Sequence, residues 1–142
     1  MKPIRVFIGQ SGTISRVTCE RLLRDEADIS LVGHADNPME ILAAVARYRP
    51  DVLIMGVEES SPHTIKLVST IRRLWPFTRT LLLPPRDSTE DWMVNLILCG
   101  ARGLLTSDAL DGQLVKALRV VSGGQVWISR RLAGSFVDRV LH

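Results

Sequence analysis

Five short apolar runs, spaced almost evenly along the chain, limit the folds that this sequence can adopt. They are "IRVFI" at 4–8, "ISLVGHA" at 29–35, "VLIM" at 52–55, "TLLL" at 80–83 and "GLL" at 103–105. Their starts lie 25, 23, 28 and 23 residues apart, which leaves room in each gap for one helix and two loops. The runs contain few polar residues, as parallel strands covered on both faces do. The pattern predicts a doubly wound α/β domain with a five-stranded parallel sheet.

Capping residues, prolines and glycines place helices in the gaps. Helices are expected within 13–25, 37–50, 61–76, 88–100 and 107–124. In the second of these segments, Asn37 is a suitable N-cap and Pro38 lies in the first turn, where proline is tolerated. Gly100 has the position of a C′ glycine at the end of the fourth helix.

Residues 125–142 follow a complete set of five βα units. Ile128, Leu132, Phe136 and Val140 recur at every fourth position, and the charged residues lie largely off this stripe, so an amphipathic sixth helix is expected. We therefore divide the chain into a domain over 1–124 and a C-terminal helical extension over 125–142. The extension can pack on the domain, offer its stripe to a partner, or lead into another domain.

The composition is that of a single globular domain. The chain has 142 residues and a formal net charge of +3, too small to indicate nucleic-acid binding without clustering on one face. Cys19 and Cys99 form no C-x-x-C pair, and both lie in apolar helical patterns typical of buried thiols. No apolar run approaches the roughly 18 residues of a membrane span. The N-terminus does not resemble a signal peptide, so a cytoplasmic protein without membrane contact is expected.

Several stretches resemble the receiver domains of bacterial response regulators, of the LuxR/FixJ (NarL-like) class in which a receiver is joined to a helix-turn-helix. The resemblance covers essentially the whole chain and is carried by 28–55, by "CGARGLLTSDALDGQLVKALRVVSGG" at 99–124 and by "VWISRRLA" at 126–133. It implies a flavodoxin-like, CheY-like (βα)5 fold and a role in two-component signalling and transcription regulation. DNA binding would belong to a helix-turn-helix domain of a longer parent protein.

Receivers of this family take a phosphoryl group from a histidine kinase onto an aspartate. An acidic pair after the first strand holds Mg²⁺, which offsets charge on the transferring group, and an aspartate after the third strand is the nucleophile. A hydroxyl after the fourth strand and a lysine after the fifth hold the phosphoryl oxygens. An aromatic residue within the fifth strand acts as a switch.

Every matching position in this sequence departs from that pattern. The acidic pair is replaced by Gln10 and Ser11, the aspartate by Gly56, the hydroxyl by Pro84, the lysine by Ser107 and the aromatic residue by Leu104. The nearest acids are Asp36, Glu58 and Glu59, which we interpret as solvated loop residues.

The resemblance, together with these departures, predicts a degenerate receiver, or pseudo-receiver, that acts without phosphorylation. No Mg²⁺, other metal or cofactor is expected, and the chain is not expected to be an enzyme. Its role would be that of a signalling and dimerisation module of a bacterial transcription regulator. A homodimer is expected, and the stripe of Leu132, Phe136 and Val140 either forms its interface or packs in the core.

One alternative gives the domain a ligand. "WISR" at 127–130 is similar to the W-[FLM]-[TS]-R motif of biofilm regulators that bind cyclic di-GMP between receiver-like domains, although Ile128 departs from it. Trp127 or Arg130 would stack on guanine, and Arg130 and Ser129 would reach phosphate at a helix N-terminus. In ordinary relatives, the tryptophan of such a segment packs and the serine caps the helix, so both interpretations stay open.

A second alternative is a nucleotide-binding α/β enzyme. It is suggested by "GQSG" at 9–12 and by Asp36 after the second run. The glycine spacing does not match the G-x-G-x-x-G fingerprint, and no Walker lysine is present. His34, His63 and His142 have no obvious catalytic partners, so the sequence favours the receiver over an enzyme.

Overall fold

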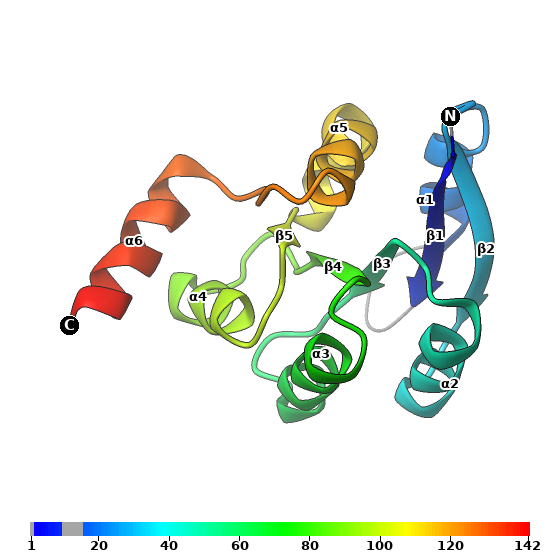
Figure 1. Ribbon diagram of the computed structural model, residues 1–142. Helices are drawn as coiled ribbons and strands as arrows, with labels where there is room; N and C mark the ends of the chain where they lie inside the picture. The colour runs from blue at the N-terminus through cyan, green and yellow to red at the C-terminus, as the bar shows by residue number, and fades with distance from the viewer. Residues whose placement is uncertain (1, 10–15) are drawn as a thin grey trace.

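Within the residues that the structure describes, 2–9 and 16–142 of a computed structural model, five parallel strands form one sheet. They are β1 (Ile4–Gly9), β2 (Ile29–Ala35), β3 (Val52–Gly56), β4 (Arg79–Leu83) and β5 (Gly103–Leu104). Their spatial order, β2-β1-β3-β4-β5, can be followed across Figure 1. This order is that of flavodoxin-like doubly wound sheets, and it confirms the fold predicted from the apolar runs.

Helices connect the strands and cover both faces of the sheet. They are α1 (Arg16–Leu23), α2 (Pro38–Tyr48), α3 (Pro62–Leu74), α4 (Glu90–Leu98), α5 (Leu110–Ser122) and α6 (Arg130–Leu141), with a short 3₁₀ turn, η1 (Ser107–Ala109), before α5. In Figure 1, α1 and α5 lie on one face, α2, α3 and α4 lie on the other, and α6 lies beside α4 beyond the β5 edge. None of these described helices is long and apolar enough to cross a membrane.

Two predicted helix ends have the expected capping geometry. The Asn37 side chain accepts a first-turn N–H of α2 at 3.0 Å. At Gly100, φ is +124°, and the Gly100 and Ala101 N–H groups donate to the Ile97 and Leu96 carbonyls at 3.0 and 3.1 Å. This Schellman arrangement requires a left-handed residue just past the helix, which explains the glycine.

Other helices are shorter than the segments in which they were expected. α3 ends at Leu74 because Trp75 precedes Pro76, and residues before proline avoid the helical conformation; the φ of Trp75 is −135°. α4 begins at Glu90 because the side chain of Thr89 caps it. η1 occupies the beginning of the segment in which α5 was expected.

Residues of the sheet alternate between two apolar layers. Leu53 and Met55 pack with α2, α3 and α4, whereas Val52 and Ile54 pack with α1 and α5. All four side chains are at most 2% exposed. The continuous apolar run in the sequence therefore follows from burial on both faces of the sheet.

Both cysteines are free thiols. Cys19 is buried and Cys99 is half-buried. Burial raises the pKa of each thiol to about 11. Because the thiolate is the reactive form, both thiols are weak nucleophiles near neutral pH, in agreement with the structural role expected for them.

The segment after α5 pairs with the outer strand of the sheet. The Trp127 N–H donates to the Arg102 carbonyl at 3.0 Å, and the Leu104 N–H donates to the Trp127 carbonyl at 2.9 Å. These bonds make a parallel bridge between Gly103 and Trp127. They cover an edge strand that would otherwise expose unpaired backbone groups. α6 begins at Arg130, shortly after this bridge, and lies against α4.

Arg119 ties α5 to the loop before β2. Its Nε donates to Asp28 at 2.9 Å, and its Nη2 donates to Asp28 at 2.9 Å and to Glu26 at 2.7 Å. The contact with Asp28 is bidentate, the strongest geometry for a guanidinium and a carboxylate. Hydrogen bonding to Arg119 lowers the pKa of Asp28 below its usual range.

Removal of Arg119 is expected to make the stability less sensitive to acid. The pKa of Asp28 is lower in the folded chain than in the unfolded chain. The contribution of the Asp28–Arg119 contact to the free energy of unfolding is therefore complete above the ordinary carboxyl pKa of about 4, and it is lost as the pH falls through the lowered value. Arg119→Met should therefore be less stable than wild type at neutral pH, and this difference should shrink between about pH 5 and pH 3. Urea unfolding at several pH values measures it.

The control is Arg24→Met, which removes an exposed arginine just after α1 that has no ion-pair partner among the described residues. This variant should follow the pH profile of wild type. If the free energies of unfolding of wild type and Arg119→Met differed by the same amount across the acid range, the role given to the Asp28–Arg119 contact would be contradicted.

Candidate functional site

The positions that the resemblance matches to the phosphorylation site of receivers meet at the carboxyl edge of the sheet. Gly56 is the last residue of β3 and pairs with the last residue of β4. Pro84 follows β4 directly, and its carbonyl accepts the Ser107 N–H at 3.1 Å. The structure therefore brings Gly56, Pro84 and Ser107 to one edge, as the topology predicts. Gln10 and Ser11, and with them most of the "GQSG" stretch, lie outside the described residues.

The side chains at these positions offer little reactive chemistry. Gly56 is buried and has no side chain, and Pro84 is buried and has neither an N–H nor a hydroxyl group. Leu104 is 7% exposed and packs in the apolar layer with α2, α3 and α4. Ser107 is half-buried at the start of η1. Since a covalent phosphoryl acceptor must carry a nucleophilic side-chain atom, Gly56 cannot be one.

Three acids lie near this edge, and one of them has a fixed partner. Asp36 and Glu58 are exposed. Glu59 is also exposed, but Thr89 donates its N–H to both Glu59 carboxylate oxygens at 3.2 Å and its hydroxyl to one of them at 2.7 Å. Within the described part of the chain, no three His, Cys, Asp or Glu residues are grouped so that they could hold a metal ion.

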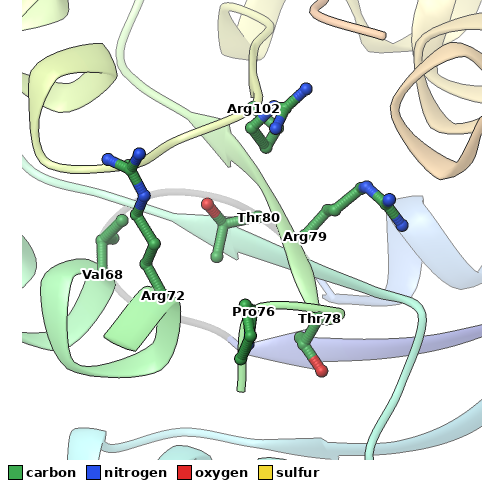
Figure 2. Close-up of a pocket in the computed structure, with 8 residues that line it drawn as sticks. Val68, Arg72, Pro76, Thr78, Arg79, Thr80 and Arg102 are labelled. Atoms are coloured by element: carbon green, nitrogen blue, oxygen red, sulfur yellow. The ribbon is translucent and has the colours of Figure 1, made fainter. Parts of the chain in front are cut away.

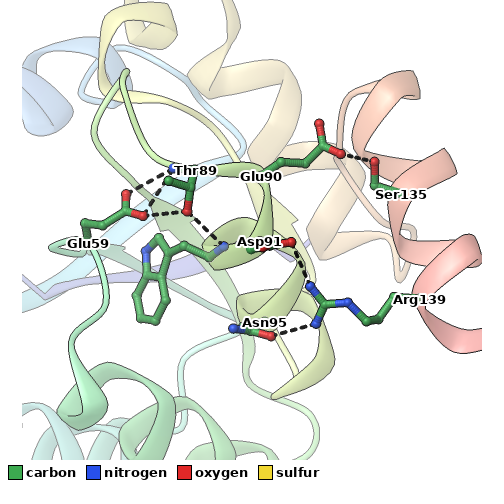
Figure 3. Close-up of polar contacts among 8 residues, drawn as sticks. Glu59, Thr89, Glu90, Asp91, Asn95, Ser135 and Arg139 are labelled. Atoms are coloured by element: carbon green, nitrogen blue, oxygen red, sulfur yellow. Dashed lines mark hydrogen bonds and ion pairs between the residues drawn. The ribbon is translucent and has the colours of Figure 1, made fainter. Parts of the chain in front are cut away.

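Thr89 joins the loop after β3 to the start of α4. Its hydroxyl donates to Glu59 and accepts the Trp92 N–H at 3.2 Å, so that one side chain caps the helix and binds the loop (Figure 3). The stretch "STED" at 88–91 indicates a helix start, but no local signal pairs Thr89 with an acid 30 positions earlier. Sequence reasoning therefore missed this contact.

α6 contacts α4 through a row of polar side chains. The Ser135 hydroxyl donates to the Glu90 carboxylate, and the Arg139 guanidinium binds both the Asn95 amide oxygen and the Asp91 carboxylate at 3.0 Å (Figure 3). Exposed ion pairs of this kind contribute only about 0–1 kcal/mol each, so their main effect is on geometry. Because Arg139 uses two separate nitrogens, it sets the position of α6 along α4.

The apolar stripe of α6 is divided between the core and the surface. Leu132 is 4% exposed and belongs to the layer with α2, α3 and α4, and Phe136 packs against the same layer. Val140, in contrast, is 59% exposed, next to the exposed Val137 and Leu141. Of the candidate dimer residues Leu132, Phe136 and Val140, the first two thus have partners in this chain. A dimer through α6 stays a prediction.

The residues of the alternative ligand motif have contacts within the chain. Trp127 packs against the apolar layer with α1 and α5, in addition to its backbone pairing with β5. The Ser129 hydroxyl accepts the Leu132 N–H at 3.1 Å and caps α6. Trp127, Ser129 and Leu132 help to line a cavity of about 330 Å³, whereas Arg130 is exposed outside it. Cyclic di-GMP binding through Trp127, Ser129 and Arg130 stays a prediction.

Comparison with known proteins identifies the kind of domain. No protein-family model matches the chain. It is 26% identical over 141 residues to the oxygen regulatory protein NreC of Staphylococcus epidermidis, an alignment that covers 98% of this chain and 64% of NreC. The structure of a LuxR-family two-component response regulator from Aurantimonas superposes with a TM-score of 0.82 at 19% identity, over 99% of this chain and 100% of that one.

A receiver domain taken alone gives a similar match. The non-phosphorylated receiver of the stress response regulator RcsB from Escherichia coli has a TM-score of 0.79 at 16% identity and covers 91% of this chain and 100% of its own. The chain is thus similar in sequence to NreC, and its fold is that of response regulator receiver domains. Because it spans 64% of the length of NreC, the similarity concerns the receiver and not the activity of the whole regulator.

Replacing Thr89 is expected to destabilise the receiver. Thr89→Ala removes the cap of α4 and the partner of Glu59, and should lower the free energy of unfolding by about 1 kcal/mol. Thr89→Ser keeps the hydroxyl and should lie close to wild type. Urea unfolding measures both variants, and an equal loss in Thr89→Ser and Thr89→Ala would contradict the capping role.

A double-mutant cycle tests the link between the two loops. Glu59→Ala should cost less in the Thr89→Ala background than in wild type, because the contact has already been removed there. Glu58→Ala serves as the matched control, since Glu58 is an exposed acid in the same loop with no ion pair to a described residue. Additive effects of Glu59→Ala and Thr89→Ala would show that the contact contributes nothing.

Proposed function

We propose that this receiver acts without phosphorylation, as a signalling and dimerisation module of a transcription regulator. The observation that carries the proposal is Gly56, which stands at the end of β3 where the resemblance expects the phosphorylated aspartate. Formation of an acyl phosphate requires a carboxylate at that point, and glycine supplies no atom that can take part.

The neighbouring positions support the same conclusion. The pattern expects a hydroxyl after β4 and an ammonium group after β5, both of which would bind phosphoryl oxygens. Pro84 and Ser107 supply neither of these groups at their respective places. Stabilisation of a transferring phosphoryl group depends on such preorganised charge, so a shifted acceptor at Glu58 or Glu59 would lack its support.

The contacts around α4 support a conformation that is set by the protein's own residues. The loop between β4 and α4 is bonded on one side to Glu59, through Thr89, and on the other side to Ser107, through Pro84. α6 adds its contacts with Asp91 and Asn95. We infer that these internal contacts replace the phosphoryl group as the determinant of the α4 surface.

A second copy of the chain is the partner that we propose for the exposed end of α6. Val137, Val140 and Leu141 are 50%, 59% and 74% exposed and continue the stripe whose first part is buried. An apolar helix end of this kind is suited to an isologous contact in a homodimer. A dimer would place two helix-turn-helix domains of a longer parent protein on paired DNA half-sites.

Phosphoryl donors are expected to leave the protein unchanged. After incubation with acetyl phosphate and Mg²⁺, intact-protein mass spectrometry should show no added phosphoryl group, because the acceptor position is Gly56. Beryllofluoride should likewise leave the sedimentation coefficient unaltered. A receiver that carries an aspartate at the matching position is the positive control, and acid-resistant, base-labile labelling of this chain would refute the proposal.

The dimer is tested at its exposed residue. Sedimentation equilibrium of wild type should show a concentration-dependent dimer, and Val140→Glu should shift the protein to monomer because it places a charge in the apolar contact. Met39→Glu is the matched control, since Met39 is 78% exposed on α2, away from α6. A wild type that remains monomeric, or an equal shift in both variants, would contradict dimerisation through α6.

A further inference from the structure

A cavity of about 210 Å³ lies at the amino edge of the sheet, where β4 and β5 begin. Its lining includes Arg72 of α3, Thr80 of β4, and Gly100 and Arg102 from the loop before β5. In Figure 2, Thr80 lies between Arg72 and Arg102. We call this cavity the arginine pocket. It shares no residue with the phosphorylation positions, which lie at the carboxyl edge.

The charge around the pocket is positive and not neutralised. Arg72, Arg79 and Arg102 all contribute to the lining, and none of the residues that line it is acidic. No ion pair joins these three arginines to an acid in the described part of the chain. Arg102 donates through Nη2 to the Gly124 carbonyl at 2.7 Å, which leaves its other N–H groups available.

The hydroxyl of Thr80 lacks a partner. Thr80 is 3% exposed, and its Oγ1 has no hydrogen-bond partner among the residues that the structure describes. A buried polar group without a partner is unfavourable, and such groups are uncommon in native proteins unless they bind something else. Valine would fill the same space in a β-strand without that cost. The hydroxyl is therefore free to donate to an occupant of the pocket that Thr80 helps to line.

Gly100 determines where Arg72 lies. A Cβ at Gly100 would approach Arg72 Cδ to 2.5 Å, which is closer than atoms can pack, so the Arg72 side chain occupies space left free by the glycine. The positive φ of Gly100, already required by the end of α4, also disfavours any other residue. The space that Gly100 leaves free thus accommodates the side chain of Arg72, an exposed residue of α3.

We propose that the arginine pocket binds a small phosphate-type oxyanion. Guanidinium groups present paired N–H donors that match the oxygens of phosphate, and the Thr80 hydroxyl supplies a further neutral donor. A cavity of about 210 Å³ suits inorganic phosphate, pyrophosphate or a small phosphomonoester, whereas larger ligands occupy pockets of about 300–1,000 Å³. Binding involves no covalent step and does not depend on the proposed loss of phosphorylation.

The position of the pocket connects it to the C-terminal helix. The carbonyl of Arg102 accepts the Trp127 N–H that holds the segment before α6 on the β5 edge. An anion bound by the Arg102 side chain would therefore act on the residue that anchors α6.

Calorimetric titration tests the pocket directly. Inorganic phosphate and pyrophosphate are titrated into wild type in chloride buffers of matched ionic strength, and we expect a dissociation constant of about 1 mM or lower for at least one of them. Arg72→Ala should weaken binding about tenfold or more, because it removes a charged donor. Arg73→Ala, which removes an exposed arginine from the neighbouring position of α3, is the matched control and should bind like wild type.

Thr80→Val provides a readout besides binding. It should weaken anion binding and also raise the thermal unfolding midpoint of the free protein, because it removes an unpaired buried hydroxyl. A lower midpoint in Thr80→Val would overturn the assignment of this hydroxyl to a ligand. The proposal would also be overturned by equal losses in Arg72→Ala and Arg73→Ala, by no binding of either anion up to about 20 mM, or by a preference of the pocket for duplex DNA over both small anions.

Discussion

The backbone pairing of Trp127 with β5 is the contact on which the C-terminal part of the structure depends. β5 is only two residues long, and this pairing closes the edge that it would leave open. Gly103 also lets β5 pack closely on its neighbours, because a Cβ there would lie 2.8 Å from side-chain atoms of both Leu81 and Val121. The pairing fixes the start of α6 and so places this helix on α4.

The contacts of α4 support the proposal that this receiver fold presents one fixed surface. Switching by phosphorylation requires an element with two arrangements of similar free energy, whose balance the phosphoryl group shifts. Here the first turn of α4 is bonded to Glu59 through Thr89, and its side is bonded to α6 through Arg139. Each contact is exposed and weak. Together they act on a helix of nine residues and favour one arrangement of it.

The sheet, most helices and the meeting of Gly56, Pro84 and Ser107 at one edge could be predicted because their signals are local or follow from topology. Apolar runs indicate strands, Asn37 and Gly100 specify helix ends through their own capping, and a parallel sheet aligns the residues that follow its strands. The Glu59–Thr89 contact could not be predicted, because it depends on how two loops 30 residues apart pack. The division of the α6 stripe could not be predicted either, since spacing by four is the same for Leu132, which is buried, and Val140, which is exposed.

The two prolines after β4 have a consequence for the distribution of hydrogen-bond donors. Pro84 and Pro85 carry no N–H, and their carbonyls are already acceptors for Ser107 and Ser88. The two prolines therefore contribute acceptors to the carboxyl edge and no N–H donors of their own. In parallel α/β domains it is this edge that commonly receives anionic ligands. Here three arginines line a pocket at the other end of β4, so the proposed anion site lies at the edge opposite to the usual one.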